Sequence, residues 1–539
     1  MKSESKEGIV LELIRAAPNT WGRLLLVAGF AGLANTGILV LVNRGAASAA
    51  VDSATVEFRL VLLFGLCLLA FYVGKRYSLT RACITVENMV ESRLLRVSDK
   101  IRCAELEVVE HLTKGELFTK IGQDTNLISQ SALILVNAAE QSFVLLFCIA
   151  YIAWLSPLAF VAFMLMIGVA FPIYIRHSQA LGDLLKQSTA SQGNQLDALG
   201  HIIDGFKEIR LNQSKSDGVF REFTAASARV RDLRIETQMG FCVNMMFSDI
   251  AFYCLLSVVV FLLPRLYPPS AASVLMTTAA ILFAAGPLTL IVTARPVFQR
   301  AMNALTNLSE LESRLDSAVR PARPGPVPGP LFRNFQRIES VGACYTYRSD
   351  REDEGFSVGP LNLQIGRGEL IFLVGGNGAG KTTILKILTG LYTPQRGELK
   401  VDGRLIGPQT ILAYRELFST VFSDFHLFDR PYGLDGIEDA RVVAVLKEME
   451  LSDKTRFERG RFTTQNLSTG QRKRLALAIA LLENKDILVL DEWAADQDSY
   501  FRKHFYEVIL PQLKIQGKTV VATSHDEDYW RVADRVIHI

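Results

Sequence analysis

The chain has 539 residues, of which 49% are hydrophobic and 21% charged, and its mean hydropathy is +0.23. A soluble protein of this length would carry more charge, so the composition points to apolar surface that faces lipid, and it excludes disordered, collagen-like and disulfide-rich classes. The formal net charge of +3, from 58 Lys and Arg against 55 Asp and Glu, is too small to indicate a nucleic-acid partner.

Charged residues are unevenly distributed, and this divides the chain into two halves. Residues 1–317 contain long apolar runs, whereas residues 331–539 have the mixed composition of a soluble α/β domain. Between them, residues 318–330 hold five prolines in their last ten positions. Proline disrupts both helices and sheet interiors, so this stretch predicts a stiff, extended linker between a membrane domain and a soluble domain.

The first half contains enough apolar runs for an all-α membrane domain with six spans. A transmembrane helix needs about 20 apolar residues to cross about 30 Å of hydrocarbon. A domain of this kind is expected to contact the lipid bilayer. The single residue Ser156 separates two of the runs, which predicts a tight helical hairpin. The predicted spans cover residues 24–42, 58–77, 128–155, 157–175, 239–263 and 271–294.

The basic residues predict the orientation of these spans. Segments 75–127 and 176–238 carry nine Lys and Arg each, whereas segments 43–57 and 264–270 carry one each. Basic loops stay on the cytoplasmic side, so we expect the two long segments and both chain termini in the cytoplasm. Neither long segment contains proline, which favours helices that continue well beyond the bilayer.

The second half opens with a phosphate-binding motif. The apolar run 369–374 predicts a buried strand, and it leads into a sequence that matches G-x-x-x-x-G-K-[ST] and then into a helical pattern. In this motif backbone N–H groups bind phosphate, the lysine neutralises the β- and γ-phosphate oxygens, and the hydroxyl that follows it binds Mg²⁺. The residues concerned are Gly375, Gly376, Asn377, Gly378, Ala379, Gly380, Lys381, Thr382 and Thr383.

Two further motifs narrow the class of nucleotide enzyme. The apolar run 487–490 ends in Asp491, which could hold Mg²⁺, and Glu492, which could polarise the attacking water. Between this motif and the phosphate-binding loop at residues 375–383, called the P-loop below, a helical pattern begins with small polar residues. Such an opening is either an anion site or a plain helix cap, and the sequence leaves both interpretations open. Its residues are Ser468, Thr469, Gly470 and Gln471.

With these motifs, residues 331–539 resemble the nucleotide-binding domain of an ABC transporter, an α/β P-loop NTPase fold, with Thr469 where the family usually has glycine. The resemblance implies that Tyr347 stacks on adenine, that Asp498 lies in the loop after the catalytic carboxylate, and that His525 contacts the γ-phosphate. It also implies Mg²⁺ and ATP as cofactors. Two such domains sandwich two ATP molecules in the family, so a homodimer is expected.

The membrane half resembles six-span exporters. Segments 112–124 and 205–210 are similar to the first and second intracellular segments of those proteins, where short coupling helices rest on the ATPase domains. Ser423 stands where most relatives have glutamine, and residues 493–498 read Trp-Ala-Ala-Asp-Gln-Asp. Both variants are similar to bacterial cyclic-peptide and pyoverdine-type siderophore exporters.

That resemblance implies ATP-driven export of a peptide-type substrate across the bacterial inner membrane. Three alternatives remain open from the sequence. These are a lipid or lipopeptide flippase, a siderophore importer on the same fold, and a membrane-tethered ATPase that transports nothing.

Two carboxylates lie inside predicted spans. Glu140 and Asp249 are 15 and 14 residues from the outer ends of their spans, which places them at similar depth. Intramembrane carboxylates are candidates for function, and we expect these two to form an acidic ring in a substrate cavity. The alternative is that each faces a neighbouring helix and is structural.

Overall fold

A computed structural model of the chain describes residues 18–51, 58–112, 115, 117, 119–266, 271–316, 331–347, 356–434 and 436–539. The chain forms two compact units. The first comprises residues 1–98 and 114–313, and the second comprises residues 99–113 and 314–539. The predicted linker at 318–330 lies outside the described residues.

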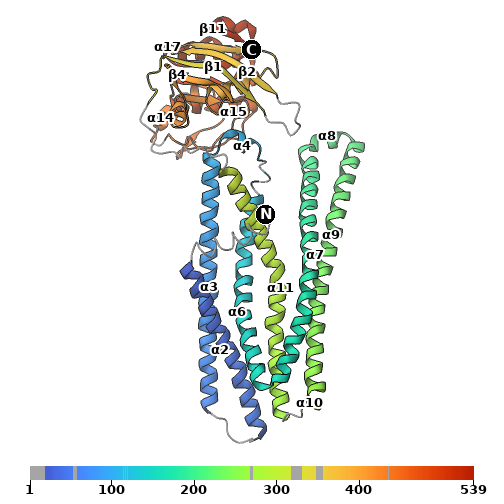
Figure 1. The fold of residues 1–539 in the computed structure, drawn as a ribbon. Coiled ribbons are helices and arrows are strands. Elements are labelled where there is room, and N and C mark those ends of the chain that lie inside the picture. The colour runs from blue at the N-terminus through green and yellow to red at the C-terminus, as the bar shows by residue number, and fades with distance from the viewer. Residues whose placement is uncertain are drawn as a thin grey trace. The chain divides into compact units, whose positions relative to one another are not determined.

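The first unit is built of long helices that run side by side (Figure 1). Its elements are α2 (Pro18–Val51), α3 (Phe58–Cys103), η1 (Thr119–Asp124), α6 (Thr125–Leu155), α7 (Pro157–Asp204), α8 (Phe206–Leu211), α9 (Gln213–Ser257), η2 (Val258–Leu262), α10 (Leu263–Leu266) and α11 (Ala271–Asp316).

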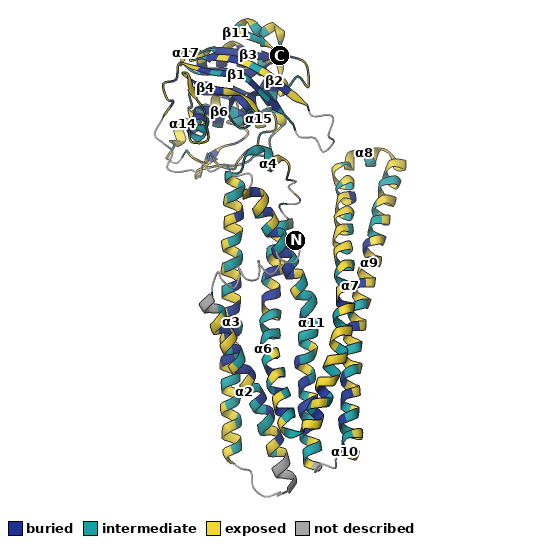
Figure 2. Ribbon diagram, in the orientation of Figure 1, coloured by how far each residue is buried: buried dark blue, intermediate teal, exposed yellow. Residues whose placement is uncertain are grey.

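Six of the described helical segments are long and apolar enough to cross a membrane, as predicted. They reach well past the apolar runs. Helix α3, for example, has 46 residues, or roughly 70 Å at about 1.5 Å per residue, against about 30 Å of hydrocarbon. Exposed apolar side chains cover the outside of these helices, among them Leu26 and Trp154, which are 76% and 77% exposed (Figure 2). Lipid is the environment in which such surfaces are stable.

Local signals explain how the helices begin and pack. Ser156 caps α7, where its hydroxyl accepts a hydrogen bond from the N–H of Ala159, and Pro157 takes the first helical position, where its missing N–H costs nothing. Gly32 allows α2 to lie close to α6, since a Cβ there would meet Cβ of Phe143 at 3.0 Å and the N of Val144 at 3.1 Å. Small residues serve the same purpose in many membrane bundles.

The second unit contains a parallel and an antiparallel sheet. The parallel sheet has the order β11-β3-β10-β9-β6, and the antiparallel sheet has the order β2-β1-β4-β5. Strands β7 and β8 form a separate, short antiparallel pair. Their bounds are β1 (Arg337–Thr346), β2 (Ser357–Gly366), β3 (Leu370–Val374), β4 (Arg396–Val401), β5 (Arg404–Leu405), β6 (Phe418–Val421), β7 (Phe457–Glu458), β8 (Arg461–Phe462), β9 (Ile487–Leu490), β10 (Thr519–Thr523) and β11 (Arg535–His538).

Helices flank these sheets. They are α12 (Lys381–Leu388), α13 (Ile411–Arg415), α14 (Asp439–Glu448), α15 (Thr469–Glu483), η3 (Trp493–Asp496), α16 (Ser499–His504), η4 (Phe505–Ile509), α17 (Leu510–Ile515) and η5 (Glu527–Val532).

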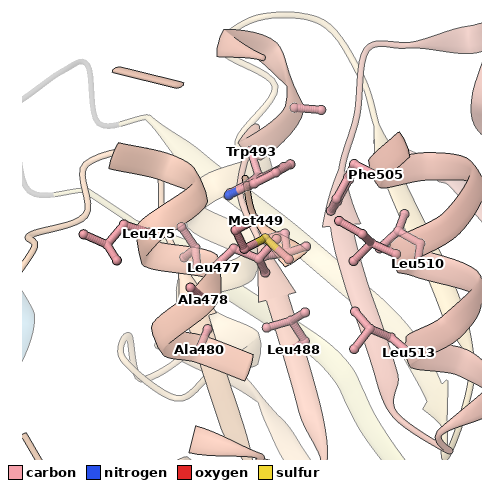
Figure 3. Packing of buried hydrophobic residues seen from close by; sticks show 14 of the residues in the cluster. Met449, Leu475, Leu477, Ala478, Ala480, Leu488, Trp493, Phe505, Leu510 and Leu513 are labelled. Carbon is pink, nitrogen blue, oxygen red and sulfur yellow. The ribbon is translucent and has the colours of Figure 1, made fainter. Parts of the chain in front are cut away.

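The central strands of the parallel sheet are buried on both faces. Every residue of β3, β9 and β10 is buried, which explains why the two predicted strands read as continuous apolar runs. One core packs around Trp493 and Met449, with Leu477 and Ala478 of α15 on one side and Phe505 and Leu510 on the other (Figure 3). The predicted combination of six long apolar helices and an α/β domain with a parallel sheet is present in the structure.

One short helix of the second unit precedes a segment predicted from sequence. Helix α4 (Leu106–Glu110) lies just before residues 112–124, where we expect the first intracellular coupling segment. Within this unit, Glu105 and Glu110 bond to residues of α13 and α12, and Leu106 packs on the cluster around Tyr392. Residues 113, 114, 116 and 118 lie outside the described residues.

Candidate ATP site

The strand order brings the predicted motifs to one edge. Strands β3, β6, β9 and β10 are parallel neighbours, so their carboxyl ends meet at the same edge of the sheet. The P-loop follows β3, Ser423 follows β6, Asp491 and Glu492 follow β9, and His525 follows β10. This is the edge at which open α/β sheets bind ligands.

The P-loop has the backbone that its glycines permit. Gly378 and Gly380 have φ of +81° and +91°, which other residues rarely adopt. A Cβ at Gly380 would also meet Val358 at 2.7 Å. Directly after this turn the chain enters α12, whose first N–H groups are free of partners within the helix and suit an anion.

The P-loop lysine is held inside the loop. Lys381 is 4% exposed, and its Nζ donates to the backbone oxygens of Gly375 at 2.9 Å and Gly376 at 3.1 Å. The same Nζ lies 3.8 Å from Oε1 of Glu492. The lysine charge is therefore positioned between the loop and the carboxylate that follows β9.

Asp491 is the centre of a set of oxygen donors. Its Oδ2 accepts from the hydroxyls of Thr382 at 2.8 Å and Ser423 at 3.1 Å, and its Oδ1 accepts from Thr523 at 3.1 Å. The carboxylate is 1% exposed. A carboxylate with two hydroxyls directed at one oxygen is the donor chemistry that Mg²⁺ prefers, so these residues fit that ion.

Glu492 adopts a backbone conformation that directs its side chain. Its φ is +47°, in the left-handed region that non-glycine residues seldom adopt. The N–H of Glu492 donates to the hydroxyl of Thr523 at 2.7 Å, and its carbonyl accepts from Nζ of Lys473 at 2.7 Å. The carboxylate then lies 3.3 Å from Nε2 of His525. Strained residues of this kind are found at functional sites.

Tyr347 lies against the end of the P-loop. Its hydroxyl and that of Thr383 are hydrogen-bonded at 3.0 Å. Its ring meets Tyr345 and Tyr392 edge-on, with centroids 5.2 Å and 5.9 Å away. The residue predicted to stack on adenine is thus beside the phosphate-binding loop and is packed among other tyrosines.

The predicted anion motif is also a helix cap. Ser468 caps α15, where its hydroxyl accepts from the N–H of Gln471 and the Gln471 side chain accepts from the N–H of Ser468. The residue after Thr469, Gly470, packs so closely that a Cβ would meet the carbonyl oxygen of Asp496 at 2.6 Å. The cap, the less specific of the two interpretations, is therefore present, and the motif packs on the loop that follows Glu492.

Arg474 ties this helix to the loop containing Asp498. Its guanidinium donates to Oε1 of Gln497 at 2.9 Å, pairs with Glu450 at 3.1 Å and bonds to Asp498. Asp498 also caps α16 through the N–H of Phe501. That N–H, together with the nearby Arg474 charge, lowers the pKa of Asp498 despite the opposing effect of its partial burial.

Sequence reasoning did not identify four of these residues. Lys473, Arg474, Gln497 and Thr523 orient the loop and the carboxylates, and none of them was assigned a role from the sequence. The basic run at 472–474 and the threonine two residues before His525 are the sequence features that could have pointed to these residues. Their roles depend on partners 19 to 32 positions away, which a local pattern does not reveal.

The two intramembrane carboxylates have different surroundings. Glu140 is 0% exposed and lies 3.6 Å from Nζ of Lys75 on α3, whereas Asp249 is exposed on α9. An acidic group in a fully buried position needs such a cation nearby. In this arrangement Glu140 faces a neighbouring helix, as in the alternative left open above, and the acidic ring remains a prediction.

A separate cavity lies between α6, α7, α9 and α11 of the first unit. Its volume is about 470 Å³, and its walls are mostly apolar, with Phe171, Phe247 and Phe298 among them. Arg295 is its cationic lining residue, and that guanidinium donates to Ser178 at 2.8 Å and lies 5.8 Å from the Tyr174 ring centre.

Comparison with known proteins agrees with this architecture. The family model described as "ABC transporter" matches residues 358–495. "ATP-binding protein SyrD" of Pseudomonas syringae pv. syringae is 31% identical over 96% of this chain and 92% of its own length. An "ATP-dependent lipid A-core flippase" of Alkalilimnicola ehrlichii is 26% identical over 78% of this chain and 73% of its own.

A solved structure shares the fold over nearly the whole length. "Structure of a bacterial Atm1-family ABC exporter with ATP bound" superposes with a TM-score of 0.78 at 16% identity, and the match covers 98% of this chain and 93% of that one. The likeness extends across membrane and nucleotide-binding parts alike.

Proposed function

The chain belongs to the ABC transporter family as an ATP-hydrolysing, multi-pass membrane exporter, and we propose that it exports a peptide-type substrate across the bacterial inner membrane as a homodimer. The observation that carries this proposal is the complete set of ATP-site residues at one sheet edge, in a chain whose likeness to SyrD covers 96% of its length. The peptide class rests on Ser423 and residues 493–498, which are similar to those of cyclic-peptide and siderophore exporters.

The residues at the ATP site have complementary roles in this proposal. Tyr347 stacks on adenine, the P-loop N–H groups surround the phosphates, and Lys381 neutralises the β- and γ-oxygens. Glu492 polarises the attacking water, and His525, at 3.3 Å, holds that carboxylate and contacts the γ-phosphate. Nζ of Lys381 is 3.8 Å from Oε1 of Glu492, so the lysine lies between the phosphates and this carboxylate.

Mg²⁺ would be held by Thr382, Asp491 and Ser423. When bound, the ion neutralises charge on the phosphate oxygens. Ser423 contributes because its hydroxyl already bonds to the same Asp491 oxygen as that of Thr382. A serine is too short to reach as far as the usual glutamine, but it is directed at the carboxylate itself.

The proposed homodimer gives a role to the motif at the start of α15. One chain has one P-loop and one set of Ser468, Thr469, Gly470 and Gln471. In a symmetric pair, each set would cover the ATP bound to the partner subunit, with Asp498 in the adjoining loop. The N-terminus of α15 is then available to the partner's nucleotide.

The orientation follows from the basic segments. With the long segments 75–127 and 176–238 in the cytoplasm, both chain termini and the ATPase half are cytoplasmic. Closure of two ATPase halves on ATP would then turn the membrane domain outward, and hydrolysis would reset it.

A second candidate function is supported by the apolar cavity. Its walls offer many apolar contacts and a cation, Arg295, which would suit a substrate with a hydrocarbon chain and an anionic group. One relative is named a lipid A-core flippase. A lipid or lipopeptide is therefore the alternative substrate class.

Reconstituted protein tests these functions. In proteoliposomes, ATP-dependent accumulation of a cyclic or nonribosomal peptide in the compartment opposite the ATPase half, absent in Glu492→Gln, supports peptide export. Stimulation of ATPase by lipid A or phospholipid but not by soluble peptides supports the flippase. Accumulation in the reverse direction identifies an importer. ATP hydrolysis that is stimulated by none of these substrates, with no substrate transported, overturns the proposal that the protein is a transporter.

A further inference from the structure

Helix α4 is attached to the nucleotide-binding half at two points. At one end, Glu105 pairs with Arg415 of α13 at 3.1 Å. At the other end, Glu110 pairs with Nζ of Lys386 at 2.8 Å and accepts a hydrogen bond from the hydroxyl of Tyr392. Between them, Leu106 packs on the apolar cluster that includes Tyr345, Ile387 and Tyr392. These contacts all lie within the second compact unit.

The two attachment points differ in what lies behind them. Arg415 donates to the backbone oxygen of Gly390, two residues after the end of α12, so this point reaches only the far end of that helix. Lys386, by contrast, is on α12 itself, five residues after Lys381, and its Nζ lies 5.2 Å from the Tyr392 ring centre. The Glu110 point thus connects directly to the helix that carries the P-loop lysine.

Tyrosines continue the connection from Glu110 to the nucleotide site. The Tyr392 ring stacks on Tyr345, with centroids 4.4 Å apart, and meets Tyr347 edge-on at 5.9 Å. Tyr347 in turn bonds through its hydroxyl to Thr383 at the end of the P-loop. Glu110 is therefore linked by direct contacts to the side chain proposed to stack on adenine.

Burial makes this linkage costly to break. The Lys386 side chain is 11% exposed, and Glu110 is the carboxylate paired with it. If Glu110 moved away, a nearly buried ammonium would lose its counter-charge, an expensive state. Burial, and then the hydrogen bond to Glu110, raise the pKa of Tyr392, so its hydroxyl keeps the proton that it donates.

We propose that Glu110, acting through Lys386 and Tyr392, positions Tyr347 for adenine, so that the Glu110 contact, and not the Glu105 contact at the other end of α4, sets the affinity of the site for ATP. This inference rests on the proposed role of Tyr347. By reciprocity, ATP binding at Tyr347 stabilises the placement of α4 in which Glu110 is engaged. Glu110, Lys386 and Tyr392 are positioning residues, because they act on the nucleotide through Tyr347 and α12.

Steady-state ATPase of the full-length protein in lipid nanodiscs tests the proposal. Glu110→Gln removes the charge, and Tyr392→Phe removes only a hydroxyl and keeps the ring. We expect each to raise the KM for MgATP by about 3- to 10-fold with kcat changed less than about twofold. The matched control is Glu105→Gln, which breaks the other α4 ion pair, and it should change the KM by less than about 1.5-fold.

A double-mutant cycle separates positioning from simple docking. Tyr347→Phe loses the bond to Thr383 and keeps the ring. Its effect on KM should be non-additive with Glu110→Gln and additive with Glu105→Gln. An equal KM shift in Glu105→Gln, full additivity in both cycles, or an unchanged KM in Tyr392→Phe overturns the proposal.

The adenine role of Tyr347 is tested separately. Tyr347→Ala should raise the KM for MgATP by at least about 10-fold, because stacking on the base is lost. An unchanged KM there refutes that role, whereas a raised KM in Tyr347→Ala with an unchanged KM in Glu110→Gln refutes only the influence of α4.

Discussion

The hydroxyl of Ser423 donates to Oδ2 of Asp491 across 3.1 Å, the same oxygen that accepts from Thr382. Ser423 replaces the glutamine typical of the family, and the hydrogen bond shows how the shorter residue is accommodated. It follows β6, which is a direct neighbour of β9 in the parallel sheet, so the backbone brings the hydroxyl to the carboxylate. The position is thus still connected to the proposed metal ligands.

Ser423→Ala should raise the Mg²⁺ concentration that gives half-maximal ATPase activity by about 3- to 10-fold, because one charge-assisted hydrogen bond to Asp491 is lost. Activity should return at saturating Mg²⁺, and EDTA should abolish it in both proteins. Ser419→Ala is the matched control, since Ser419 lies on β6 and bonds to Ala480 and Glu483 instead. An unchanged Mg²⁺ requirement in Ser423→Ala would contradict the role of Ser423.

Glu492→Gln should bind MgATP and lower the ATPase kcat by at least about 100-fold, since an amide cannot take a proton from water. The amide has nearly the same shape, and loss of the charge 3.8 Å from Lys381 leaves that ammonium free to bind phosphate. Turnover and fluorescent-nucleotide binding measure the two effects. Normal turnover in this variant would falsify the assignment of Glu492.

Gly470→Ala should lower ATPase activity by at least about 10-fold and destabilise the protein by about 1–3 kcal/mol. A Cβ there would lie 2.6 Å from the carbonyl oxygen of Asp496, so the loop that leads to Asp498 must move. Gly407→Ala is the control, because a Cβ at that glycine meets nothing within 4 Å. Similar activity and thermal stability in the two variants would show that the close packing at Gly470 is unimportant.

The sequence was most informative where a local pattern determines the structure. Apolar runs predicted the six spans, and continuous apolar stretches predicted β3 and β9 because strands buried on both faces consist mostly of apolar residues. Ser156 predicted a helical hairpin because a single polar residue between two spans leaves room only for a cap.

Contacts between distant positions could not be predicted in the same way. Glu110 and Lys386 are separated by 276 positions, and both read as ordinary surface charges in their own segments. Glu140 shows the same dependence on a distant partner. A carboxylate in an apolar run indicated function, but its environment depends on Lys75, which the hydropathy pattern places only at the end of another span.

Asp498→Asn should lower the melting temperature at pH 7 by about 1–3 °C and leave it closer to the wild-type value at pH 3. The amide oxygen can still cap α16, but the charge beside Arg474 is lost. The pKa of Asp498 lies below its usual value of 3.8 in the folded protein, chiefly because the Phe501 N–H bonds to the carboxylate. The folded state therefore binds this proton less tightly than the unfolded state, so the stabilisation is complete above pH 3.8 and disappears as the pH falls through the folded value. Thermal denaturation in detergent from pH 7 to pH 3 measures the difference between the two proteins, which is screened because Asp498 is 60% exposed. A difference that stays constant down to pH 3 would mean that shape alone, and not the charge of Asp498, stabilises this loop.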